Sequence, residues 1–256
     1  MKITAYAKVN LCLDILEKTP SGYHEIRTIF HEIKNFKDIL EINKTKLKDE
    51  VSIAHDLKKS PDQKGKTEIK LSENLAKKAL DLLKKTFNIK DFVSIKIHKN
   101  IPISSGLGGA SSDAAAVLKG LSELFKLNLS EKRLLYLAEQ IGMDVPFFIV
   151  GGTALGTHFG EKITKLSEIN SALLNVKIFP KSSELKEKTR KAYENLDLSK
   201  YGQNKAKTEL VLKGIETGDK KLIIENLHND FETSLKKPLQ KNVHLSGSGP
   251  SVFTCI

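Results

Sequence analysis

The part of the sequence best suited to chemistry is a segment rich in glycine and serine, residues 102–112, between an expected strand and an expected helix. Glycines allow backbone N–H groups to approach an anion closely and adopt positive φ, and the start of a helix adds a favourable dipole. This glycine-rich segment therefore predicts a phosphate-binding site. The residues concerned are Pro102, Ile103, Ser104, Ser105, Gly106, Leu107, Gly108, Gly109, Ala110, Ser111 and Ser112.

The glycine-rich segment matches neither of two common phosphate-binding loops. A Walker A loop needs Gly-Lys-Ser/Thr, and a dinucleotide-binding GxGxxG turn needs glycine where Ser111 stands. A flexible surface loop is the alternative interpretation. Glycines and paired serines placed directly at a helix start favour phosphate binding over such a loop.

The composition indicates a globular protein with a basic surface. The chain has 256 residues, 39% of them hydrophobic, which is enough for a sizeable core, and we expect two compact lobes. The formal charge of +11, from 42 Lys and Arg against 31 Asp and Glu, favours nucleic acid, an acidic membrane surface or a phosphorylated ligand as partner. Because the lysines are spread along helix faces, we interpret most of them as solvated surface.

Two cysteines, Cys12 and Cys255, are too few for a disulfide framework and lack metal-ligand spacing. We therefore expect a cytoplasmic protein. The N-terminal apolar run is interrupted by Lys8, Asn10 and Asp14, so it fits neither a signal-peptide core nor a membrane span.

Alternation of apolar and polar residues predicts strands early in the chain, and helical spacing begins after residue 72, with Ser72 or Asn74 as cap. Residues 39–43 and 51–55 are expected to be short edge strands, and 58–66 an exposed loop. The other expected elements are strands at 1–16, 25–33, 92–98 and 175–179, helices from near 75, 112 and 130, a strand from 151, helices at 183–195 and over 205–236, and strands near 243 and 253.

Three motifs share one family resemblance. PISSGLGGASSDAA at 102–115 resembles the second motif of the GHMP kinases, named for galactokinase, homoserine kinase, mevalonate kinase and phosphomevalonate kinase. AYAKVNL at 5–11, with GYHE at 22–25, resembles the first motif, and LSGSGPS at 245–251 resembles the third. The resemblance extends over nearly the whole chain.

Two further motifs, GMDVPFF at 142–148 and NDFE at 229–232, are similar to those of GHMP kinases that act on a cytidine-diphosphate-linked methylerythritol. This implies ATP-dependent phosphorylation of the 2-hydroxyl of that alcohol, in the non-mevalonate route to isoprenoids and terpenoids. It also implies an α+β, two-lobed fold. A ribosomal-S5-domain-2-like lobe at 1–158 would bind ATP and carry out catalysis, and a ferredoxin-like lobe would follow at 159–256.

The resemblance also implies a catalytic pair. An alcohol is a poor nucleophile at neutral pH, so a carboxylate must orient it and accept its proton. Asp144 matches the family's aspartate, and Lys8 matches the lysine that holds this carboxylate ionised. Alternatively Asp144 is a turn residue before Pro146 and Lys8 an exposed strand cation, although a charge within an apolar strand costs energy unless it has a partner.

Recognition of cytosine calls for aromatic stacking and hydrogen bonds. By resemblance, Tyr23 and His24 match the cytidine contacts, Asn10 a substrate hydrogen-bonding position and Tyr193 a second stacking aromatic. From the residues alone, Tyr23 could cover the sheet edge, His24 could be a turn histidine and Tyr193 could pack inward. In the family the third motif closes over the site, and by resemblance Gly247, Ser248 and Gly249 are substrate-binding residues. The alternative is that this motif is simply a tight Gly-Pro turn.

Asn74 and Lys99 lie where the family contacts the nucleotide, although both also suit cap and strand-end roles. ATP is expected with Mg²⁺, for which no protein ligand is predicted beyond Ser112 as a candidate by analogy.

The sequence departs from the family after Ser251, where a further helix and strand usually follow, so we expect either a truncated second lobe or a sequence from which residues are missing. Another GHMP kinase, such as a homoserine or mevalonate kinase, is one alternative, but its substrate carries no base and would leave GYHE unexplained. An RNA-binding protein with the first-lobe fold is the other, although no Arg-rich or interleaved aromatic patch supports it. We expect a small-molecule substrate, no nucleic acid or membrane partner, and a monomer or homodimer.

Overall fold

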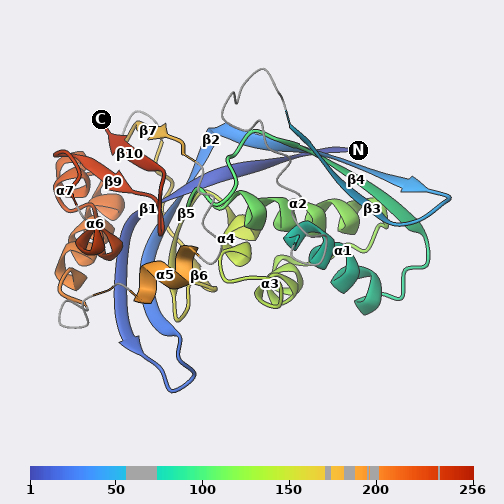
Figure 1. Cartoon of the computed structure of the whole chain (residues 1–256), viewed down its shortest axis with the longest axis horizontal. Coiled ribbons are helices and arrows are strands. Elements are labelled where there is room, and N and C mark those ends of the chain that lie inside the picture. Colours follow the sequence, from blue (N-terminus) through green and yellow to red (C-terminus); the bar gives the residue numbers. More distant parts are fainter. Residues whose placement is uncertain (56–73, 171–173, 182–187, 195, 197–201, 236) are drawn as a thin grey trace. The chain divides into compact units, whose positions relative to one another are not determined.

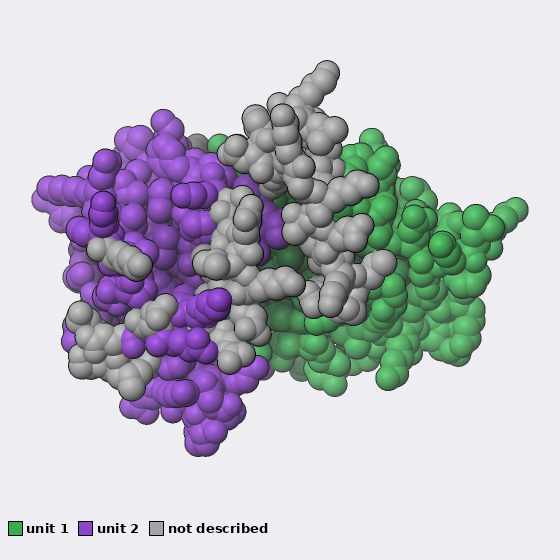
Figure 2. Space-filling view, viewed as in Figure 1, with its two compact units in different colours: residues 1–7, 34–101, 108–149 green, residues 8–33, 102–107, 150–256 purple. Residues whose placement is uncertain are grey.

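The computed structural model describes two compact units, coloured separately in Figure 2. The expected boundary between residues 158 and 159 stays a prediction. The expected loop at 58–66, the alternative cap Ser72, and residues 183–187 and 195 of an expected helix lie outside the described residues. The described residues are 1–55, 74–170, 174–181, 188–194, 196, 202–235 and 237–256. Unit 1 comprises 1–7, 34–101 and 108–149, and unit 2 comprises 8–33, 102–107 and 150–256.

Unit 1 is a sheet with helices packed on one face (Figure 1). Its strand order is β3-β4-β2-β1, with β4 antiparallel to β2 and β3 parallel to β4. A Cβ on Gly120 of α2 would lie 2.6 Å from the side chains of Ile3 and Ile42, so this helix lies directly on the sheet. The elements are β1 Lys2–Lys18 and β2 His24–Thr45, both shared with unit 2, β3 Glu50–His55, β4 Phe92–Lys99, α1 Leu75–Thr86, α2 Gly109–Leu124, α3 Glu131–Glu139 and α4 Val145–Val150.

Two helix starts in unit 1 confirm the sequence analysis. The side chain of Asn74 accepts hydrogen bonds from the N–H groups of Ala76 (2.9 Å) and Lys77 (3.4 Å), and that of Ser130 accepts one from Arg133 (3.3 Å). Each satisfies N–H groups that have no partner within the helix.

Strand β2 corrects one expectation. Residues 25–33 and 39–43 belong to one strand of 22 residues, and 39–43 lies between β4 and β1 instead of at an edge. The polar run between them suggested a break, but Asp38 within it is fully buried. Tertiary contacts therefore override the local polarity.

Unit 2 contains two sheets. One has the order β6-β5-β2-β1-β8, and the other has the order β7-β10-β9 with antiparallel pairing. The elements are β5 Thr153–Thr157, β6 Lys162–Lys165, β7 Val176–Phe179, α5 Lys188–Glu194, α6 Lys205–Thr217, α7 Lys220–Glu225, β8 His228–Asn229, a 3-10 helix Asp230–Ser234, β9 Val243–Leu245 and β10 Val252–Cys255.

The expectation of helices throughout 205–236 is wrong near its end. His228 and Asn229 form strand β8, which pairs in parallel with Cys12 and Leu13 of β1. Residues 228–231 are also held by the neighbouring core, because Phe231 packs in a buried hydrophobic cluster. Burial of each such side chain contributes about 1.5–3 kcal/mol to the free energy of folding. The other members of the cluster are Leu13, Ile15, Ile26 and Leu245.

The mixture of helices and strands in both units confirms the α+β class. Among the described residues, no helix is both long and apolar enough to span a bilayer.

Candidate functional site

Three backbone segments of unit 2 meet at the first half of the glycine-rich segment. The N–H of Lys8 donates to the carbonyl oxygen of Leu107 (3.0 Å), and the N–H of Ser251 donates to that of Ser105 (3.0 Å). The hydroxyl of Ser246 donates to the carbonyl oxygen of Gly106 (2.9 Å). Residues from three separate sequence motifs therefore lie side by side within this unit.

Gly106 makes this close approach possible. Its φ is +84°, and a Cβ at this position would lie 2.1 Å from the carbonyl oxygen of Ser246. No larger residue fits without moving the backbone of one of the two segments.

The Lys8 ammonium is buried and oriented by a chain of hydrogen bonds. Lys8 is only 3% exposed, and its Nζ donates to Asn10 Oδ1 (2.7 Å). Asn10 Nδ2 donates to Thr28 Oγ1 (2.8 Å), which donates to the carbonyl oxygen of Cys12 (2.7 Å). The alternative interpretation of Lys8 as an exposed strand cation is therefore wrong, while its catalytic role stays a prediction.

The third-motif loop is held beside Lys8 by residues of the NDFE motif. Asn229 Nδ2 donates to the carbonyl oxygens of Leu245 and Gly247 (both 2.8 Å), and Glu232 Oε1 accepts the N–H of Leu245 (2.7 Å). A Cβ on Gly247 would lie 3.3 Å from Lys8 Nζ. The sequence analysis assigned no role to Asn229 or Glu232, although the NDFE motif was a signal for both.

His24 and Tyr193, predicted substrate contacts from distant parts of the chain, lie together in unit 2. Their rings stack at 5.1 Å between centroids with an interplanar angle of 6°. Tyr193 also meets Phe231 edge-on at 4.9 Å and packs against the core cluster, as the inward-packing alternative expects. Burial, with a smaller contribution from Lys18, lowers the pKa of His24 and favours a neutral imidazole.

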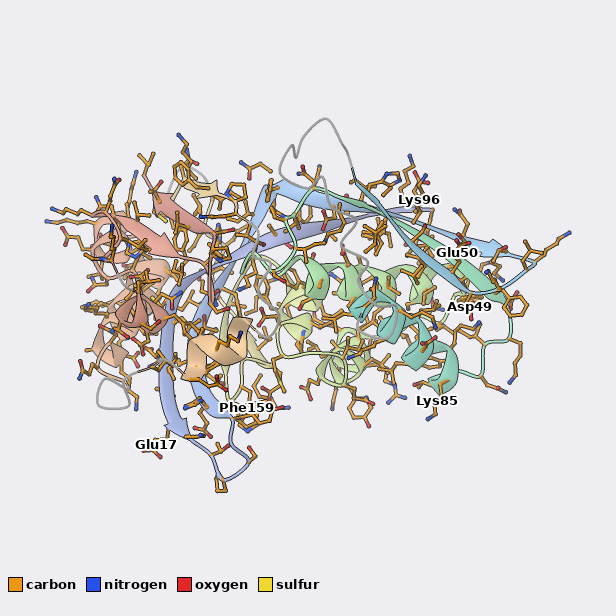
Figure 3. All side chains as sticks on the ribbon, viewed as in Figure 1. Glu17, Asp49, Glu50, Lys85, Lys96 and Phe159 are labelled. Carbon is orange, nitrogen blue, oxygen red and sulfur yellow. The ribbon has the colours of Figure 1, made fainter. Side chains whose placement is uncertain are left out.

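Tyr23 is the exposed aromatic of this region. Its side chain is 61% exposed, and its ring lies 5.6 Å from that of Phe159 at an angle of 50°. Phe159, labelled in Figure 3, lies in a turn in which its own backbone N–H donates to Glu161 Oε2 (3.0 Å). The sequence analysis did not identify Phe159, because its partner is 136 residues away in the chain.

The second half of the glycine-rich segment belongs to unit 1 and opens helix α2. The helix begins at Gly109, earlier than the expected start near residue 112, and Gly108 is its N-cap with φ +73°. Glycine has no side chain with which to cap the first N–H groups, and those groups suit an anion. Ser112, the candidate metal contact, is buried in the first turn.

The other predicted nucleotide and catalytic residues of unit 1 lie in different settings. Asn74 caps α1, as described above. The ammonium of Lys99 is 7% exposed and lies between the carboxylates of Asp38 (2.5 Å) and Asp113 (2.8 Å). Asp144 lies half-buried in the turn directly before α4. Direct contacts of these residues with a ligand stay predictions.

Comparison with known proteins identifies the family. The family model described as "GHMP kinases N terminal domain" matches residues 74–152. A 4-diphosphocytidyl-2-C-methyl-D-erythritol kinase of Caldicellulosiruptor bescii is 41% identical over 99% of this chain and 88% of its own length. The chain belongs to the GHMP kinases.

Solved structures agree with this GHMP kinase assignment. A crystal structure of 4-(cytidine 5'-diphospho)-2C-methyl-D-erythritol kinase matches 99% of the chain and 89% of its own, with a TM-score of 0.73 and 26% identity. A homoserine kinase from Cytophaga hutchinsonii matches all of the chain and 85% of its own, with a TM-score of 0.74 but 18% identity. The second likeness shows the shared two-lobed fold alone.

Proposed function

We propose that this GHMP kinase transfers the γ-phosphoryl group of ATP to the 2-hydroxyl of 4-diphosphocytidyl-2-C-methyl-D-erythritol, in the non-mevalonate route to isoprenoids. The observation that carries the proposal is the setting of Lys8, whose buried ammonium is held by Asn10 while its own backbone binds the glycine-rich segment. The identity of 41% to a kinase of this name supports the substrate.

The proposed reaction is an in-line displacement in which the substrate oxygen forms a bond to the γ-phosphorus and the bond to the oxygen of ADP breaks. Asp144 orients the hydroxyl and accepts its proton, and the products are ADP and a phosphate monoester. Lys8 contributes positive charge near the reacting oxygens, and its hydrogen bond to Asn10 restricts the directions in which the ammonium can point.

The nucleotide phosphates are proposed to bind the glycine-rich segment, where Gly106 and Gly108 have positive φ and helix α2 begins at Gly109. Mg²⁺ bound to the phosphate oxygens would offset negative charge during transfer. Among the described residues, no group of three or more His, Cys, Asp or Glu side chains could hold a metal ion. The hydroxyl of Ser112 is the protein group that would contact the ion.

The alcohol substrate is proposed to bind residues of unit 2. Tyr23 presents an exposed ring on which a pyrimidine can stack, and the neutral imidazole of His24 can exchange hydrogen bonds with the base edge. The side chains of Asn10 and Tyr193 are also proposed to contact this substrate. Backbone N–H groups of Gly247 and Ser248 would bind the diphosphate, beside Gly249, whose own N–H donates to the carbonyl oxygen of Ser246 (2.8 Å).

We also propose a cytoplasmic enzyme that acts as a monomer or homodimer, with the ATP-binding lobe at 1–158 and the second lobe at 159–256. Two polyphosphate ligands account for the charge of +11 without a nucleic acid partner.

A substrate panel tests the proposed function. The purified protein with ATP and Mg²⁺ is offered the cytidine diphosphate alcohol, mevalonate or homoserine, and ADP release is followed in a coupled assay. We expect turnover with the first alcohol only. Turnover of mevalonate or homoserine instead would overturn the substrate, and nanomolar, salt-dependent RNA binding without ATP turnover would overturn the enzyme class.

A further inference from the structure

Lys99 is the cation of a buried cluster in unit 1 that the proposed chemistry does not use. Its Nζ lies 2.5 Å from Asp38 Oδ2 and 2.8 Å from Asp113 Oδ2, and all three side chains are at most 7% exposed. We call Asp38, Lys99 and Asp113 the Lys99 cluster. Buried charges of this kind stabilise a fold little by themselves, so what they hold in place matters more than their number.

The cluster holds the chain where it enters the glycine-rich segment. Asp38 Oδ1 accepts the backbone N–H groups of Asn100 (2.5 Å) and Ile101 (2.8 Å), which directly precede residue 102. With Lys99 on its other oxygen, this carboxylate receives three hydrogen bonds from consecutive residues. The position and direction of the entering backbone are therefore fixed to strand β2.

The cluster also holds the chain where it leaves the segment. Asp113 follows Ser112 directly and lies in the first part of helix α2. A Cβ on Gly109 would lie 2.9 Å from Ile101 Cγ2 and 3.1 Å from Lys99 Nζ, so the two ends of the segment approach each other closely. Lys99 thus joins the carboxylate at the entry to the carboxylate at the exit.

The charges of the cluster depend on one another. Burial raises the pKa of Asp113. Lys99 opposes this increase, and the negative charge of Asp38 adds to it. Burial would lower the pKa of Lys99, but Asp113 and Asp38 raise it above its usual range. Lys99 therefore stays charged, and its attraction opposes the burial that favours the neutral form of the Asp113 carboxyl.

We propose that the Lys99 cluster is a positioning cluster, which fixes the separation of the two ends of the glycine-rich segment and so keeps its backbone N–H groups arranged for nucleotide phosphates. The inference rests on the proposed binding of ATP by this segment. Lys99 then acts through Asp38 and Asp113, and not by touching the nucleotide.

Strand β4, which ends at Lys99, offers a matched control near its start. Lys84 Nζ lies 2.5 Å from Asp49 Oδ2, and Asp49 Oδ1 accepts the N–H of Val93 (2.8 Å) near the start of β4. Asp49 is labelled in Figure 3. This second arrangement has the same ammonium, carboxylate and backbone N–H chemistry, but its backbone partner, Val93, does not adjoin the glycine-rich segment.

The test compares Lys99→Met, Asp38→Asn and the isosteric Asp113→Asn with Lys84→Met in the full chain. Titration calorimetry gives the dissociation constant of a non-hydrolysable ATP analogue with Mg²⁺, and hydrogen exchange reports the amides of residues 102–112. We expect the three cluster variants to bind the analogue about tenfold to hundredfold more weakly, with faster exchange in the segment. Lys84→Met should change neither quantity, and Asp113→Asn keeps the test usable if Lys99→Met does not fold.

Each other outcome counts against the inference. Folded cluster variants that bind the analogue like the wild type overturn it while leaving the proposed function intact. Weaker binding by Lys99→Met alone, with unchanged exchange and a normal Asp38→Asn, shows that Lys99 contacts the nucleotide directly. A wild-type chain that does not bind the analogue at all sinks both this inference and the proposed function.

Discussion

A buried cluster of charged groups in unit 1 and another in unit 2 differ in what they connect. The Lys99 cluster of unit 1 joins the two ends of the glycine-rich segment. In unit 2, His228 Nε2 lies 2.9 Å from Asp14 Oδ1, and Thr208 Oγ1 donates to Asp14 Oδ2 (2.6 Å). We call Asp14, Thr208 and His228 the His228 cluster, which ties β1 to β8 and α6, all regular elements.

The comparison teaches that burial and charge do not by themselves indicate a functional site. Both clusters have strong hydrogen bonds and side chains that are almost fully buried. Only the Lys99 cluster has backbone partners that lead into a segment with positive φ and an uncapped helix start. We therefore expect the His228 cluster to affect stability alone, and the Lys99 cluster to affect nucleotide binding as well.

The largest expected effect comes from His228→Asn. Removing one partner of a buried charged pair leaves Asp14 without its cation and should lower the free energy of unfolding by about 3 kcal/mol. The KM for ATP should stay within about twofold of the wild type, because no backbone of the glycine-rich segment depends on this cluster. Urea denaturation and steady-state kinetics measure the two effects, and a selective rise in the KM for ATP would break the comparison.

The His228 cluster also predicts a pH dependence of stability. Burial would lower the pKa of His228, but hydrogen bonds to Asp14 and Cys12 raise it to about 10, from 6.5. Because the folded state holds this proton more tightly, the stabilisation is complete below pH 6.5 and is lost as the pH rises through 10. The free energy of unfolding should fall by about 2 kcal/mol between about pH 7 and pH 9.

His228→Asn is the control for this pH effect, since it removes the titrating group. Subtracting its denaturation curves from those of the wild type isolates the contribution of His228. A difference between the two proteins that does not change with pH would show that His228 is not protonated as described.

Two closely packed helical glycines, Gly109 of unit 1 and Gly214 of unit 2, give a second comparison between the units. A Cβ on Gly109 would lie 2.9 Å from Ile101, and a Cβ on Gly214 of α6 would lie 2.9 Å from Ile223. Alanine at either position should lower the free energy of unfolding by about 1 to 2 kcal/mol through overpacking. Only Gly109→Ala should also weaken binding of the ATP analogue, and equal binding by both variants would remove the distinction between the units.

The smallest expected effect is at Tyr23 of unit 2. Tyr23→Ala should raise the KM for the cytidine diphosphate alcohol about tenfold, because a base stacked on an aromatic ring is worth roughly 1–3 kcal/mol. The KM for ATP should stay nearly constant. Steady-state kinetics with each substrate varied in turn gives both values, and equal rises would argue against cytosine stacking.

The sequence predicted the elements whose patterns are local. Alternation located β1 and β4, and capping chemistry gave Asn74 as one of two candidate caps for α1. The family motifs placed Lys8, Asn10 and the third-motif loop in one neighbourhood, which the hydrogen bonds of unit 2 confirm.

The parts that the sequence did not predict depend on pairing between distant residues. Asp38 and Lys99 are 61 residues apart, and the polar run around Asp38 suggested a break in β2 instead of a buried carboxylate. Strand β8 is two residues long and has no pattern of its own, so only its pairing with β1 defines it. Neither cluster could be derived from periodicity or spacing.

The central claim, phosphoryl transfer to an alcohol with Asp144 as base, has one direct test. Phosphorus NMR of a reaction containing ATP, Mg²⁺ and the cytidine diphosphate alcohol follows ADP and the new phosphate monoester together, for the wild type and for Asp144→Asn. The account predicts equal amounts of the two products from the wild type and a rate lowered by about 10²–10⁴-fold, with unchanged folding, in the variant. ADP without the monoester, or a variant rate close to that of the wild type, would contradict it.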